Sequence, residues 1–76
     1  MSPDRLVYMA NQIAANFAVQ GAARALPQIA DHVNLFWDPR MRAAMAAHLD
    51  AGGAGLHPLA LQALSEGMRR PELPVA

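Results

Sequence analysis

The sequence is 76 residues long, contains no cysteine and carries a formal net charge of zero at pH 7. This length allows one small domain, and a hydrophobic content of 54% excludes a chain that is disordered by composition. Disulfides are excluded, the three histidines lack ligand-like spacing, and the balanced charge disfavours a nucleic-acid binder. A core this small usually needs a disulfide, a metal or a partner, so a partner protein is the remaining common support.

The first predicted helix spans residues 3–20. Ser2 is expected to cap it, Pro3 and Asp4 suit its first turn, and Gly21 can end it. Helical phase gives it one apolar stripe that we assign to the core, which consists of Leu6, Ala10, Ile13 and Phe17. A second apolar face carries Tyr8, Ala15 and Val19. Because a small core covers one face only, Tyr8 and Val19 are predicted to meet a partner.

The second predicted helix spans residues 26–37, and its start is open because Pro27 disfavours a helical Leu26. Its core stripe is predicted to consist of Leu26, Ile29, Val33 and Phe36. Trp37 lies at the edge of this stripe, where it could be a lid over the core or an anchor for a partner. We expect both roles, with Trp37 partly buried between the second and third helices and its remaining edge available for docking.

The third predicted helix spans residues 39–51, with Asp38 as its cap and the AGGAG turn at 51–55 as its end. One face is expected to carry Met41, Ala44, Met45, His48 and Leu49, with His48 a core or interface histidine. Arg40 and Arg42 lie about 160° apart on a helix, so one is expected to pair internally while the other reaches out.

His57 and Pro58 open a fourth predicted helix over residues 58–69, whose apolar face carries Leu61, Leu64 and Met68. The expected fold is therefore all-α, a small single domain of about four short helices over residues 1–70. Residues 71–76, rich in proline, are expected to form a flexible tail.

Chemistry-bearing patterns are weak in this sequence. AGGAG lacks the lysine and the hydroxyl residue of a phosphate-binding loop, and no nucleophile–base pair or metal cluster stands out. We therefore predict no catalytic, cofactor-binding or metal-binding residue. No signal peptide or membrane span is recognisable, which favours a cytoplasmic protein without membrane contact.

Three blocks in sequence order carry a resemblance to a known family: MANQIAANFA at 9–18, IADHVNLFWDPRMR at 29–42 and AHLDAGGAGLHPLALQAL at 47–64. They resemble the delta subunit of the soluble NAD-dependent formate dehydrogenases. The resemblance implies an accessory, non-catalytic subunit that docks on the large alpha subunit and supports its assembly or stability. Two alternatives remain, a transient assembly factor for the apo-enzyme and an independent helical homodimer.

The resemblance also implies the surroundings of the chain. The complex oxidises formate to CO2 and reduces NAD⁺. Its alpha subunit carries molybdopterin guanine dinucleotide with molybdenum or tungsten and iron–sulfur clusters, while beta and gamma subunits carry FMN and further clusters. The chain itself is expected to bind none of these. The expected partner interface combines positions from the helical faces and from the resemblance, namely Tyr8, Asn11, Gln12, Val19, Trp37, Arg40, Arg42 and His48.

Overall fold

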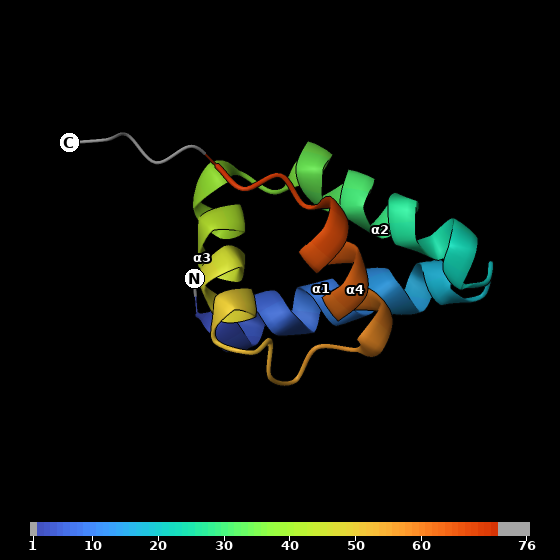
Figure 1. Ribbon diagram of the computed structural model, residues 1–76, viewed down its shortest axis with the longest axis horizontal. Helices are drawn as coiled ribbons and strands as arrows, with labels where there is room; N and C mark the ends of the chain where they lie inside the picture. The colour runs from blue at the N-terminus through green and yellow to red at the C-terminus, as the bar shows by residue number, and fades with distance from the viewer. Residues whose placement is uncertain (1, 72–76) are drawn as a thin grey trace.

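The computed structural model describes residues 2–71; residues 1 and 72–76 lie outside its described part. Its helices are α1 (Pro3–Ala18), α2 (Ala22–Phe36), α3 (Pro39–Asp50) and α4 (Pro58–Gly67) (Figure 1). The described residues contain no strand, which confirms the predicted small all-α fold of four short helices. Apart from Pro71, the predicted flexible tail falls on residues that are not described.

The starts of α1 and α3 follow the expected capping pattern. The Ser2 hydroxyl accepts a hydrogen bond from the Arg5 N–H at 3.4 Å, and the Asp38 carboxylate accepts one from the Met41 N–H at 2.9 Å. Each cap is followed by a proline, whose missing N–H costs nothing in the first helical turn. Local sequence is therefore sufficient to set where these two helices begin.

The start of α2 differs from the predicted one, because the helix begins at Ala22 and continues through Pro27. Gly21, with φ of +88°, lets the chain turn from α1 into α2 within three residues. α2 buries one face in the core through Ala25, Ile29, Ala30 and Val33, and this burial offsets the backbone hydrogen bond that Pro27 lacks. Tertiary packing thus overrides the local preference of the residue before proline.

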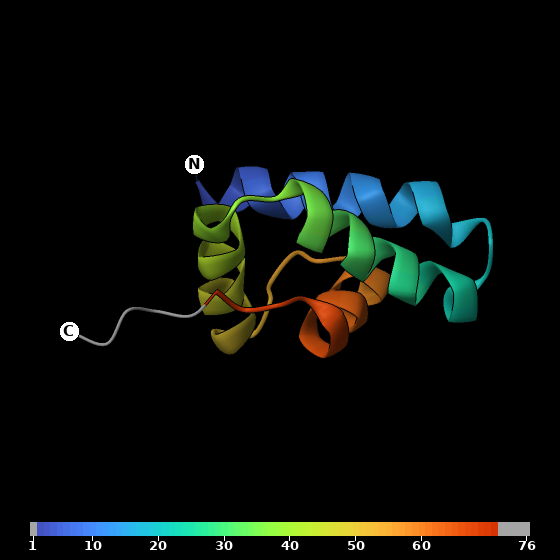
Figure 2. The same ribbon diagram turned by 90° about the horizontal axis from the view of Figure 1, so that it is seen from above.

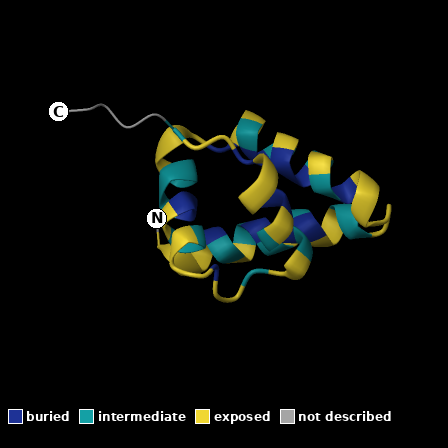
Figure 3. Cartoon of the chain, viewed as in Figure 1, coloured by how far each residue is buried: buried dark blue, intermediate teal, exposed yellow. Residues whose placement is uncertain are grey.

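The helices pack around one core. α1 and α2 form a hairpin, α4 packs against both of them, and α3 crosses the end of the hairpin where α1 begins (Figures 1 and 2). The buried faces of the helices point toward one another (Figure 3). The largest fully buried side chains come from all four helices and are Leu6, Ile29, Val33, Met45 and Leu64.

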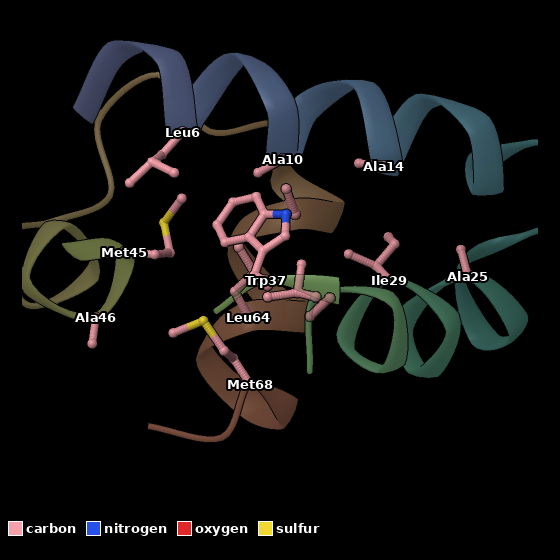
Figure 4. Close-up of a cluster of buried hydrophobic side chains, with 13 residues drawn as sticks. Leu6, Ala10, Ala14, Ala25, Ile29, Trp37, Met45, Ala46, Leu64 and Met68 are labelled. Atoms are coloured by element: carbon pink, nitrogen blue, oxygen red, sulfur yellow. The ribbon is translucent and has the colours of Figure 1, made fainter. Parts of the chain in front are cut away.

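The predicted core stripes are correct for most of the chain, with one exchange. Phe36, predicted in the core, is 71% exposed, whereas Trp37 is only 5% exposed. The chain leaves the helix at Trp37, whose extended backbone turns the indole inward beneath Ala10 and between Met45 and Ile29 (Figure 4). Trp37 is therefore the residue of this pair that joins the core, and it is more completely buried than expected.

Candidate partner-binding groove

An open groove runs between α1, the last turn of α2 and the first turn of α3. Its volume is about 360 Å³. Most of its lining side chains are apolar or aromatic, and the full lining is Tyr8, Met9, Gln12, Ile13, His32, Phe36, Trp37 and Met41. Trp37 and Met41 belong to the core or pack against it, so the groove floor is continuous with the core.

Exposed aromatic side chains border this groove on two helices. Tyr8 of α1 is 63% exposed and Phe36 of α2 is 71% exposed. The His32 ring lies one turn before Phe36, with the ring centres 4.8 Å apart, and it meets Phe17 edge-on at 6.4 Å. Sequence reasoning did not assign His32 or Phe36 to an interface. Their spacing of four residues in a helix is the one signal that places both on the same side.

A smaller hollow of about 210 Å³ adjoins the groove at Met41. It is lined by Leu6, Asp38, Arg40, Met41 and Ala44. Arg40 is exposed here, and the one ion pair found within residues 2–71 joins Arg70 to Asp50 instead. The guanidinium of Arg40 is therefore available at the edge of the groove.

The predicted interface residues do not form a single surface. Tyr8, Gln12 and Trp37 line the groove, and Arg40 lies at its edge. Val19 is 88% exposed but directly follows the last residue of α1, outside the groove lining. The structure thus brings together four of the eight predicted positions.

Three of the remaining predicted positions make hydrogen bonds within the chain. The Arg42 guanidinium donates to the carbonyls of Trp37 at 3.3 Å and Arg69 at 2.8 Å. This matches the expectation that one of Arg40 and Arg42 pairs internally while the other reaches out. The His48 ring nitrogen Nε2 lies 2.8 Å from the Ala54 carbonyl oxygen, so this side chain holds the glycine-rich turn.

Asn11 is the third such residue. Its amide donates to the Gly55 carbonyl at 3.0 Å and accepts from the His57 N–H at 2.8 Å. The His57 ring nitrogen Nδ1 in turn accepts from the Leu59 N–H at 3.1 Å and caps α4. Asn11 therefore ties α1 to the loop that leads into α4, a role that its position in the sequence did not indicate.

Residues 2–71 contain no group of three or more His, Asp and Glu side chains that could hold a metal ion. The Arg70 guanidinium, hydrogen-bonded to Asp50, lowers the pKa of that carboxyl, but this pair belongs to the surface beside α3 and not to the groove. In the same part of the chain, no helix has the length and apolar character needed to cross a bilayer.

Fold and groove together define a small all-α domain with an exposed apolar surface. A family model described as NADH-dependant formate dehydrogenase delta subunit FdsD matches residues 5–64, which is most of the chain. The chain therefore belongs to this family, and the resemblance seen in the sequence is confirmed. No curated protein and no solved structure matches it.

Proposed function

We propose that this chain is an accessory, non-catalytic subunit that docks on the large alpha subunit of NAD-dependent formate dehydrogenase and supports its assembly or stability. The family match identifies the enzyme of which such a chain is a subunit, and the open apolar groove is the observation that supports docking. Tyr8 and Phe36 expose large aromatic surfaces to water in the free chain. Burying such surfaces against a partner is favourable, and aromatic residues are prominent among the anchors of protein interfaces.

In this proposal the chemistry belongs to other subunits. Formate oxidation uses molybdopterin guanine dinucleotide with molybdenum or tungsten in the alpha subunit, and electrons pass through iron–sulfur clusters and FMN of the alpha, beta and gamma subunits to NAD⁺. The present chain has no cysteine, so it supplies no thiolate to a cluster. Its contribution is a protein contact within a cytoplasmic complex.

Co-purification tests the proposal. A tagged alpha subunit is purified from cells that express all subunits, and the ratio of this chain to alpha is measured in the fraction with formate-dependent NAD⁺ reduction. A fixed stoichiometry in the active fraction is expected. Presence only on cofactor-free alpha would replace the proposal with a transient assembly factor. A chain that sediments as a dimer and binds no enzyme subunit would replace it with an independent homodimer.

A further inference from the structure

The groove has one end that differs in charge from the rest. Arg5 lies one turn before Met9 on α1 and hence on the same side of the helix as this lining residue. Arg40 stands in the hollow that shares Met41 with the groove. Both arginines are exposed, and neither makes an ion pair among the residues that the structure describes. One exposed cation thus comes from the first turns of α1 and another from the first turn of α3, the two helix starts that border this side of the groove.

The acidic residues nearby do not cancel this charge fully. Asp4 lies in the first turn of α1, and Asp38 is the capping residue of α3. Both residues therefore stand at a helix N-terminus, which carries a partial positive charge of roughly half an elementary charge, and the Asp38 carboxylate accepts a hydrogen bond from the first turn of α3. The helix termini thus offset part of the two negative charges, and the end of the groove formed by Arg5 and Arg40 is left with a positive balance. It suits a partner that brings carboxylates.

The backbone around the groove restricts the shape of that partner. Apart from Trp37, every lining residue lies on a helix, and the Trp37 N–H and C=O are already bonded to Val33 and Arg42. The border therefore presents no unpaired strand edge to which an extended chain could add. An extended segment laid on apolar side chains would leave its own N–H and C=O groups without partners. A helix satisfies its backbone internally and offers one apolar face. The two methionines of the lining, Met9 and Met41, can adapt their side chains to such a face.

We propose that the groove binds an amphipathic helix of the large alpha subunit, which places apolar residues between Tyr8 and Phe36 and carboxylates beside Arg5 and Arg40. This inference rests on the proposed function, and it names the element and the chemistry of the partner. The apolar residues follow one another at intervals of three or four, as required for one helical face. The carboxylates set the direction of the bound helix along the groove.

Binding of the full chain to the purified, cofactor-loaded alpha subunit tests the groove. Phe36→Ser and Arg40→Glu are each expected to weaken binding about tenfold or more, as for central interface residues. The matched controls are Val19→Ser and Arg24→Glu, which make comparable changes at exposed positions outside the groove lining. They are expected to leave the affinity within about threefold of the unaltered chain, as for residues outside an interface. All four residues are exposed, and circular dichroism verifies that each variant is folded.

Salt dependence separates the charge contribution from the apolar one. Binding of the unaltered chain is expected to weaken as salt rises, and the Arg40→Glu variant is expected to lose most of this dependence. Phe36→Ser retains it. If the groove variants bind alpha as tightly as the unaltered chain does, the groove is not the binding site, and the proposed function still stands. Failure of the unaltered chain to bind alpha would overturn the proposed function itself.

A photo-reactive phenylalanine analogue at position 36 identifies the occupant. The expected cross-link is to alpha, in a segment with regularly spaced apolar residues and nearby acids. A synthetic peptide of that segment is expected to gain helical circular dichroism when the chain is added. A cross-link to a loop, to another subunit or to a second copy of this chain overturns the inference.

Discussion

Asn11 on α1 and Asn34 on α2 hold opposite ends of α4, and each does so with one donated and one accepted hydrogen bond to the backbone. Asn11 donates to the Gly55 carbonyl and accepts from the His57 N–H, while Asn34 donates to the Gly67 carbonyl at 2.9 Å and accepts from the Arg69 N–H at 2.7 Å. In both cases the two backbone groups are two residues apart. One side-chain amide thus replaces backbone partners at each end of the helix.

These amide contacts matter because α4 is short. It spans Pro58–Gly67, and isolated helices shorter than about 12 residues are marginal in water. Its stability therefore depends on packing through Ala60, Ala63 and Leu64 and on the two amides at its ends. The same short helix covers the core between α1 and α2, so loosening it exposes the core.

Replacing either amide is expected to destabilise the chain. Asn34→Ala removes two hydrogen bonds and should lower the free energy of unfolding by about 1–2 kcal/mol, since water can reach these partly exposed groups. For a domain of this size, each kcal/mol lowers the melting temperature by about 4–8 °C. Urea unfolding measures the change. Asn16→Ala is the control, because Asn16 is exposed on α1 and makes no side-chain hydrogen bond within residues 2–71. Equal midpoints for the two variants would contradict a role for the amide.

The adjacent residues Phe36 and Trp37 are expected to respond in opposite ways to truncation. Trp37→Ala empties the centre of the core and should cost about 3–5 kcal/mol, enough to unfold much of the chain. Phe36→Ala removes an exposed ring and should change stability by less than about 1 kcal/mol. Thermal unfolding followed by circular dichroism compares them. Because Trp37 is the one tryptophan, its fluorescence should also be shielded from acrylamide in the folded chain. An accessible tryptophan would contradict its placement in the core.

Gly67→Ala is expected to destabilise the chain although alanine is the better helix former. A Cβ at position 67 would lie 2.7 Å from the Cβ of Ala30, so α4 and α2 would have to move apart. Overpacking of this kind costs about 1–3 kcal/mol, which exceeds the gain of roughly 1 kcal/mol in helix propensity. The double variant Gly67→Ala with Ala30→Gly restores the space. The loss of unfolding free energy in the double variant should be smaller than the sum of the losses in the two single variants. Strict additivity of these losses in denaturant unfolding would count against the close contact.

Acid is expected to remove the contribution of the Asp50–Arg70 pair. The pair has two short contacts of 2.8 and 3.0 Å, and hydrogen bonding to Arg70 lowers the pKa of Asp50 in the folded chain. Because the pKa is lower in the folded chain, the pair stabilises the folded state at pH values above the ordinary carboxyl pKa. This stabilisation is lost as the pH falls through the pKa of Asp50 in the folded chain. Arg70→Gln should raise the pKa of Asp50 toward its usual range.

The stability difference between Arg70→Gln and the unaltered chain should be small at neutral pH, since both side chains are more than half exposed. It should disappear at low pH and shrink in high salt. Carboxyl chemical shifts followed by NMR give the pKa, and denaturant unfolding at several pH values gives the stability. A difference that grows as the pH falls would contradict the assigned sign.

Some features of this protein follow from the sequence alone because they depend on neighbouring residues. The pairs Ser2–Pro3 and Asp38–Pro39 start helices independently of the tertiary fold, because the capping hydrogen bond and the first turn involve only neighbouring residues. Gly52 follows the last turn of α3 for the same reason, whereas Gly21, expected to end α1, lies three residues past its last residue and caps the start of α2. Helical periodicity also identified Leu6, Ile29 and Met45 as core residues, because one face of each helix must be buried.

Tertiary structure decided the features that depend on distant residues. Pro27 is inside α2 because the buried face of this helix packs on the core. Asn11 bonds the loop before α4 because α1 passes beside that loop. Most clearly, Trp37 and Phe36 exchange the places that helical phase predicts. The helix ends between them, and the space among α1, α3 and α4 accepts the indole. Adjacent side chains at a helix end point apart, so only the packing of the other helices determines which one is buried and which one borders the groove.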